Sequence, residues 1–252
     1  MSKFDKFSKS NNPMLKEEVF QRNSVLDEGM VGSESRATMT VSGAVNKTLI
    51  LFAIMLGGSA FSFMFPSQIL MWTGILGGAA IYFIASRNPE RSPMLAPLYA
   101  LVEGFLVGTV TSYYMYTFDG IVFNAVTLTM AILFMMLTLY KAGVIKVTDK
   151  FRSGVSMAVG AVMMLYLVNI VLHFFGVSIP FLHDGGLFSI GISAVIIGVA
   201  SLNLLLDFDS FDKGEAHGAP KYMEWYSAMG LLFTLVWLYL EILRLLSFLS
   251  ND

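Results

Sequence analysis

Long apolar stretches separated by short polar connections make up the chain from about residue 45 onwards. A helix needs about 20 mainly apolar residues to cross the hydrocarbon core of a bilayer, and each stretch is of about this length. The pattern therefore predicts an all-α, polytopic membrane protein with seven transmembrane helices. We expect the spans at residues 45–64, 68–86, 95–116, 122–140, 153–174, 187–207 and 223–249.

The first 42 residues are polar, with six basic and six acidic side chains, scattered Ser and Asn, and no apolar period. Such a composition does not bury enough apolar surface to offset the conformational entropy lost on folding. The sequence therefore predicts two regions. They are a flexible cytoplasmic tail over residues 1–42 and a seven-helix transmembrane domain over residues 43–252.

Basic residues alternate between the connections. Those near residues 65–67, 117–121 and 175–186 contain no Lys or Arg, whereas the intervening connections and the N-terminal tail contain several. Short loops that carry Lys and Arg stay on the cytoplasmic side of a membrane. We therefore expect a cytoplasmic N-terminus and, with seven spans, a C-terminus on the opposite side.

Composition narrows the classes of function. Hydrophobic residues make up 56% of the chain, the net charge is −2 and there is no Cys. These values favour neither a nucleic-acid partner nor a disulfide or thiolate metal site. The chain also lacks a His-Glu-x-x-His motif, a phosphate-binding Gly-rich loop and a Gly-x-Ser-x-Gly elbow. We expect no enzymatic activity, no cofactor and no structural metal.

Glu241 lies inside Trp225–Leu249, a stretch that otherwise has the composition of a membrane-spanning helix. A carboxylate at that depth costs a few kcal/mol or more, so it usually faces a bundle interior or a water-filled cavity and marks a route for ions or protons. Arg244 lies three residues further on and shares a helix face with Glu241. A gating role for Glu241 and simple neutralisation by Arg244 are both compatible with this spacing.

Other acids lie in or at the ends of apolar stretches. Glu103 is followed by Gly104-x-x-x-Gly108, a spacing that lets another helix approach closely, so Glu103 has either a structural or a functional role there. Asp207 and Asp209 come at the end of the sixth expected span. Asp209 is compatible with a solvated helix end. We consider Glu103 and Asp209 candidates for an ion pathway.

Three motifs near the end of the chain carry a family resemblance. They are Asn203-Leu204-Leu205-Leu206-Asp207-Phe208-Asp209, Glu224-Trp225-Tyr226 and Trp237-Leu238-Tyr239-Leu240-Glu241-Ile242-Leu243-Arg244-Leu245-Leu246. With the seven-span pattern, they make the chain similar to the Bax inhibitor-1 family, in particular to a bacterial branch with a long polar N-terminal tail. The resemblance implies a bundle whose last helix is central and is wrapped by the other six, and a pH-dependent calcium leak.

The resemblance also implies roles for residues. The family gates with two acids that share a proton, and they correspond to Asp207 and Glu241. Arg87 corresponds to a basic residue that is the alternative partner of the first acid. Measured along the helices at 1.5 Å per residue, Asp207 lies about 9 Å from the cytoplasmic face and Glu241 about 22 Å, so direct pairing of the two acids stays open.

The sequence thus leads to two hypotheses of function. The first is a pH-sensitive calcium leak channel in a bacterial plasma membrane, gated by intramembrane carboxylates, with the bilayer, calcium ions and protons as its partners. The alternative is a regulatory membrane protein that transports nothing and binds a membrane protease or another complex through its cytoplasmic side.

Overall fold

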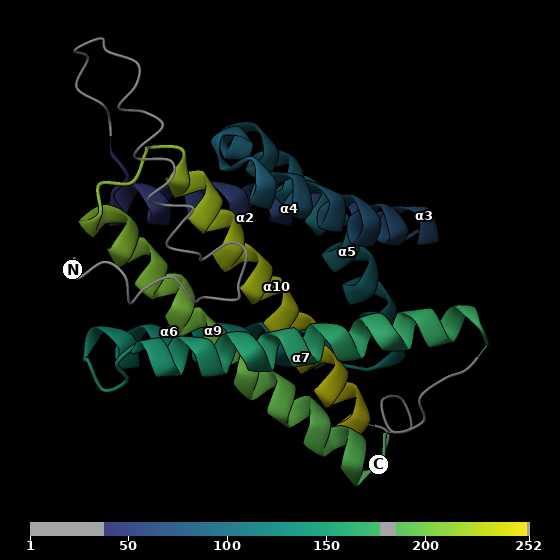
Figure 1. Ribbon diagram of the computed structural model, residues 1–252. Coiled ribbons are helices and arrows are strands. Elements are labelled where there is room, and N and C mark those ends of the chain that lie inside the picture. The colour runs from purple at the N-terminus through teal and green to yellow at the C-terminus, as the bar shows by residue number, and fades with distance from the viewer. Residues whose placement is uncertain (1–37, 177–184, 251–252) are drawn as a thin grey trace. The chain divides into compact units, whose positions relative to one another are not determined.

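The computed structural model describes residues 38–176 and 185–250, and in these ranges the chain is helical without a β-strand. Seven helical segments are long and apolar enough to cross a membrane, which confirms the predicted all-α fold with seven spans. They are α2 (Val41–Met64); α3 (Gln68–Trp72), the π-helix η2 (Thr73–Gly77) and α4 (Gly78–Arg87); the 3-10 helix η3 (Pro89–Arg91) and α5 (Ser92–Thr117); α6 (Ile121–Lys141); α7 (Asp149–Phe174); α9 (Leu187–Ala216); and α10 (Met223–Ser250) (Figure 1).

Hydropathy placed the sixth span at residues 187–207, while Phe208 and Phe211 predicted that its helix continues past Asp207. The continuation is confirmed, since α9 reaches Ala216. Phe208 and Phe211 are buried, so the helix keeps an apolar side beyond Asp207. Near the start of the described residues, α2 begins at Val41, with Thr40 as its N-cap. Most of the predicted flexible tail, residues 1–37, lies outside the described residues.

The described chain divides into two compact units. Unit 1 contains the residues up to Tyr113 together with Asp207–Phe233, and unit 2 contains Tyr114–Leu206 together with the residues from Thr234 onwards. Helices α5, α9 and α10 each contribute residues to both units.

Within unit 1, α5 lies against α2 at backbone contact. A Cβ atom on Gly104 would lie 2.4 Å from the Met55 carbonyl oxygen, and one on Gly108 would lie 2.1 Å from the Ser59 carbonyl oxygen. The Ser62 hydroxyl donates across the same contact to a carbonyl of α5. The close helix approach that the Gly104-x-x-x-Gly108 spacing predicts is therefore confirmed.

The second span packs on another side of α5, also through glycines. A Cβ atom on Gly74 would lie 2.5 Å from Leu106 Cβ, and one on Gly78 would lie 2.7 Å from Glu103 Oε2. This second pair of glycines was not predicted from the sequence. Because α5 contacts glycine-bearing neighbours on two sides, its carboxylate at Glu103 is placed against the second span, whereas Gly104 and Gly108 face α2.

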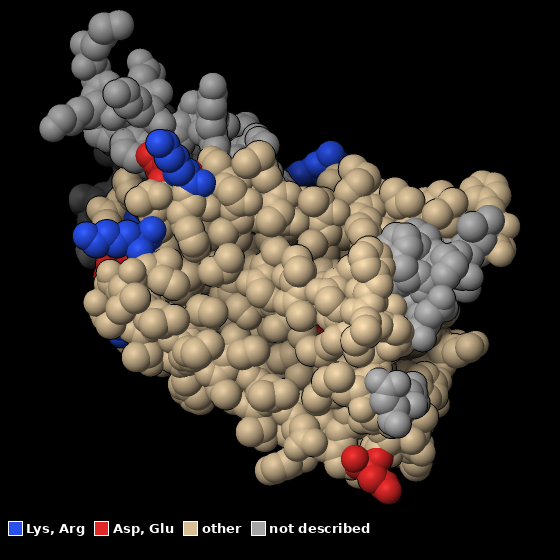
Figure 2. All heavy atoms as spheres, turned by 90° about the horizontal axis from the view of Figure 1, so that it is seen from below, with Lys and Arg blue, Asp and Glu red and all other residues tan. Residues whose placement is uncertain are grey.

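Helix α10 is the most buried of the seven spans. Its most apolar 18-residue window is 72% buried, compared with 11–56% for the other six. The surface that Figure 2 shows is formed mainly by uncharged residues. Burial of α10 agrees with the expectation that the last helix lies among the others, and it removes the acids of this helix from contact with lipid.

Candidate functional site

Four carboxylate side chains are buried among the described residues. Glu103 is 7% exposed, Asp207 5%, Glu224 0% and Glu241 4%. Three of these four acids were singled out from the sequence, and Glu224 was not. A buried carboxylate needs partners to compensate its charge, so the surroundings of each decide what it can do.

Glu241 lies in unit 2 within a network that joins three helices. The Tyr166 hydroxyl of α7 donates a hydrogen bond to the Glu241 carboxylate. Arg244 Nη2 lies 2.8 Å from Glu241 Oε2 and 3.2 Å from the Ser193 hydroxyl of α9. The guanidinium of Arg244 also lies over the Tyr166 ring, 5.5 Å from its centroid.

Because Glu241 lies inside α10, its charge is compensated by side chains and not by backbone N–H groups. Backbone N–H groups inside a helix are already bonded to carbonyls one turn earlier, so Arg244 and Tyr166 supply the compensation that the structure shows. The expected proximity of Glu241 and Arg244 is observed, whereas Tyr166 was missed. A tyrosine in an apolar span gives no sequence signal, because it is common there as a packing residue.

Asp207 lies in unit 1, on α9. A Cβ atom on Gly230 of α10 would lie 4.0 Å from Asp207 Oδ1, so the acid is close to the α10 backbone. Tyr82 of α4 is near enough to Asp207 to interact with it electrostatically. Asp209 is only partly buried, and its Oδ2 pairs with Lys213 Nζ at 3.2 Å, one turn further along the helix.

Glu103 lies within hydrogen-bonding reach of Tyr99, whereas Asp207 is near Tyr82. Tyr99 lies one turn before Glu103 on α5, and its ring centroid is 6.3 Å from that of Tyr82. Tyr82 also contacts Phe233 of α10, at 5.1 Å between centroids. Unit 1 therefore holds two buried acids, each beside one tyrosine of a contacting pair, an arrangement that hydropathy alone does not predict.

Arg87 ends α4 and is exposed, with its guanidinium over the Phe83 ring at 4.1 Å from the centroid. An ion pair between Arg87 and Asp207 stays a prediction. The shared proton between Asp207 and Glu241 also stays a prediction, because these two acids belong to different units.

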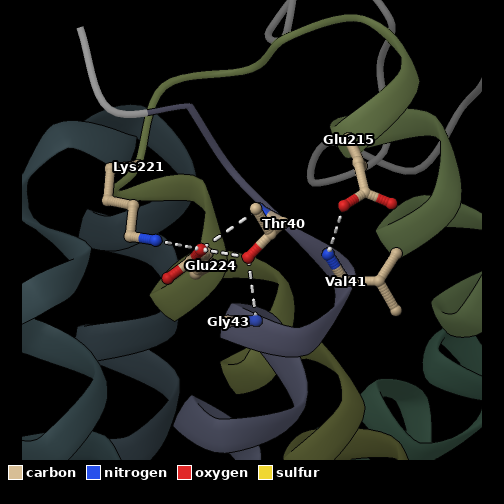
Figure 3. Close-up of polar contacts among 6 residues, drawn as sticks. All are labelled: Thr40, Val41, Gly43, Glu215, Lys221 and Glu224. Carbon is tan, nitrogen blue, oxygen red and sulfur yellow. Dashed lines mark hydrogen bonds and ion pairs between the residues drawn. The ribbon is translucent and has the colours of Figure 1, made fainter. Parts of the chain in front are cut away.

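Glu224, the fourth buried acid, lies in the first turn of α10 (Figure 3). Its Oε1 accepts hydrogen bonds from the N–H and the hydroxyl of Thr40, both at 3.1 Å, and lies 2.8 Å from Lys221 Nζ. The sequence does not mark Glu224 as a buried acid, because it follows a polar loop, where an acid normally lies in solvent.

Comparison with known proteins agrees with the sequence motifs and the seven helices. Among the described residues, no three His, Asp or Glu side chains are grouped closely enough to hold a metal ion. No curated protein matches the chain. A family model described as Bax inhibitor 1 like matches residues 9–251. The match covers nearly the whole chain, including all seven spans, so the protein is a multi-pass membrane protein that belongs to the Bax inhibitor-1-like family.

Proposed function

We propose that the protein is a pH-sensitive calcium leak channel of a bacterial plasma membrane, with a cytoplasmic N-terminus and with intramembrane carboxylates as its gate. The observation that carries the proposal is Glu241, a buried acid in the last span whose charge is compensated by Arg244 and Tyr166. A carboxylate at such a position usually marks a route for ions or protons.

Protonation of Glu241 would change the network in a defined way. The ionised carboxylate attracts Arg244 and accepts the Tyr166 hydrogen bond, so it ties α10 to α7 and, through Ser193, to α9. A proton on Glu241 removes the charge that holds Arg244, and charge-assisted hydrogen bonds are about twice as strong as neutral ones. The contact between these helices is then weaker, and this difference is the proposed gate.

The acids of unit 1 supply charge for the path of the cation. Asp207 and Glu103 are buried, and the tyrosines beside them, Tyr82 and Tyr99, contact each other. Carboxylate oxygens are the ligands that calcium prefers, and a tyrosine hydroxyl both donates and accepts hydrogen bonds. In this proposal Asp207 belongs to the gate, with Arg87 as its alternative partner. Glu103 and Asp209 line the ion pathway.

Reconstitution tests the proposal directly. The purified protein is placed in liposomes that contain a calcium-reporting dye, and calcium entry is followed at several values between about pH 6 and pH 8, a range in which buried carboxylates can titrate. We expect entry above that of empty liposomes, with a rate that depends on pH. Entry equal to that of empty liposomes at every pH would exclude the channel.

The alternative function is regulation without transport, in which the chain docks a membrane protease or another complex. The polar composition of residues 1–37 favours it, since this segment is rich in charges of both signs. Deletion of these residues discriminates between the two functions. A lost cellular phenotype with unchanged calcium entry would favour docking, whereas parallel loss of both would favour the channel.

A further inference from the structure

The chain enters its first helix through residues 38–41, which lie along the loop between α9 and α10. We call these four residues the strap. Thr38 and Pro220 form an isolated antiparallel bridge. Next to this bridge, the Met39 N–H donates to the Ala219 carbonyl at 2.7 Å. The strap is therefore held to the loop by backbone pairing, as an edge strand would be.

The strap also contacts the end of α9. The Met39 side chain is 1% exposed and lies where Gly214 has no side chain, since a Cβ atom on Gly214 would lie 2.5 Å from Met39 Sδ. The Val41 N–H, at the start of α2, donates to Glu215 Oε1 at 3.3 Å (Figure 3). A buried apolar side chain and a charged acceptor thus fix the strap on the last turn of α9.

The third attachment is to the start of α10, through Glu224. The Thr40 hydroxyl donates to Glu224 Oε1 at 3.1 Å and accepts from the Gly43 N–H at 3.0 Å, so it uses its donor and an acceptor position at once. A Cβ atom on Gly43 would lie 1.9 Å from Glu224 Oε1, so only glycine leaves room for the carboxylate. Lys47 of α2 lies over the Trp225 ring at 4.7 Å from its centroid, next to the same contact.

Electrostatics explain why a fully buried acid is stable here. The N-terminus of a helix carries a partial positive charge and free N–H groups. Glu224 lies in the first turn of α10 and accepts the N–H of Thr40, the N-cap of α2. One carboxylate therefore serves the N-termini of two helices, and loss of its contact with Thr40 would release the strap from α10.

We propose that the strap is a regulatory clasp on the two helices that carry the gating acids, Asp207 on α9 and Glu241 on α10. While it is closed on Glu224, it holds the end of α9 and the start of α10 to the first span and restrains their opening. Its release increases the rate of the calcium leak. The inference rests on the proposed function, because the leak is its readout.

The absence of Cys from the chain makes a reversible lock possible. Thr38 and Pro220 are opposite one another without bonding to each other, and Cα atoms in such pairs lie about 4.5 Å apart. This spacing falls within the range that a disulfide bridges, about 4.4–6.8 Å. In the full-length Thr38→Cys/Pro220→Cys variant, oxidation closes the strap covalently and a reductant reopens it.

Calcium entry into liposomes is compared for the oxidised and reduced double variant and for each single Cys variant. We expect the oxidised double variant to conduct about fivefold more slowly than its reduced form. A factor of this size is at the lower end of the range by which one site usually affects another. Single Cys variants should not respond to the reductant. Equal rates for the oxidised and reduced double variant would overturn the clasp and leave the channel in place. Absence of entry in every form, wild type included, would instead overturn the proposed function and the clasp with it.

The opposite perturbation opens the strap. Thr40→Ala removes the hydroxyl that joins Glu224 to Gly43, and we expect calcium entry about fivefold faster than in the wild type. Thr48→Ala is the matched control, because in the part of the chain that the structure describes the Thr48 hydroxyl bonds within α2, to the Ala44 carbonyl at 2.9 Å. A Thr40→Ala rate equal to that of Thr48→Ala would overturn the clasp, because the proposal requires slower entry when locked and faster entry when released.

Discussion

The two units keep their helices together by different means. In unit 1, α5 meets its neighbours at the glycines 58, 74, 78, 104 and 108, where a Cβ atom would come within 2.1–2.7 Å of an atom on another helix. In unit 2, the positions of a Cβ atom on Gly154, Gly160, Gly191 and Gly198 have no described atom within 4 Å. The contact of unit 2 that involves an acid is made by long side chains, those of Tyr166, Glu241 and Arg244.

This difference indicates which contacts can change and which cannot. Backbone-to-backbone contact through glycine leaves no side chain to rotate, so it is either kept or lost as a whole. A carboxylate, a guanidinium and a phenol can exchange partners when one of them gains a proton. We therefore expect changes at the glycine contacts of unit 1 to affect stability and changes in the Glu241 network of unit 2 to affect the response to pH.

The largest functional effect is expected from Glu241→Gln. Glutamine keeps the size and hydrogen-bonding capacity of the side chain but does not ionise, so most of the pH response of calcium entry should be lost. The measurement is calcium entry from about pH 6 to pH 8, with the melting temperature determined in parallel. Glu90→Gln, at an exposed acid of η3, is the control. A lower melting temperature with the pH response intact would show that Glu241 only neutralises Arg244.

Gly108→Ala should have the largest effect on stability. The added methyl group would lie 2.1 Å from the Ser59 carbonyl oxygen, which belongs to the backbone and has no free rotation. Overpacking of this kind costs about 3 kcal/mol, which corresponds to a melting temperature lower by about 10 °C. The pH profile of the fraction that folds should be unchanged.

Gly160→Ala is the matched substitution in unit 2. Gly160 lies inside α7 with no described atom near its Cβ position, and Ala is a better helix former than Gly by about 1 kcal/mol. Its melting temperature should equal or exceed that of the wild type. If Gly108→Ala and Gly160→Ala were equally harmful, the contrast between the units would be wrong.

A smaller effect is expected from Tyr166→Phe, which removes one hydroxyl and keeps the ring beside Arg244. Loss of a buried hydrogen bond to a carboxylate costs about 1–2 kcal/mol, and the pH at which calcium entry is half-maximal should move. Tyr116→Phe, at a residue that is 81% exposed, controls for the loss of a hydroxyl. Identical pH profiles for the two variants would remove Tyr166 from the gate.

Arg87→Ala should have the smallest effect. The guanidinium lies over the Phe83 ring on the surface, and an exposed contact of this type contributes about 0.5–1 kcal/mol. The melting temperature should therefore change by only a few degrees. A shift in the pH profile of calcium entry would reveal an ion pair between Arg87 and Asp207 in the conducting protein, whereas an unaltered profile would leave Arg87 as a surface residue.

Hydropathy predicted the seven spans because each depends on a property of a whole segment. It placed the end of the sixth span too early because the acids Asp207, Asp209 and Asp212 lower the local average. The positions of Phe208 and Phe211 correctly predicted that the helix continues past Asp207, because these residues keep one side of it buried. Glycine spacing predicted that another helix packs closely on α5, since Gly104 and Gly108 are four residues apart on one continuous helix, and the structure identifies that helix as α2.

The partners of the buried acids were harder to predict, because they come from distant parts of the chain. Glu241 is joined to Tyr166, which lies 75 residues earlier. Glu224 is joined to Thr40, 184 residues earlier, and a sequence without a fold gives no reason to connect them. Arg244 was predictable as a partner of Glu241 because the two share a helix face.

The π-helical turn η2, Thr73–Gly77, is a place where the second span can lose one residue. A π turn holds about one residue more than an α-helical turn. Deleting one residue from this turn would restore an α-helix and leave Gly78 facing Glu103. A deletion further along α4 would instead rotate everything after it by about 100°. The second span can thus differ in length by one residue at η2 and still present the same face to α5.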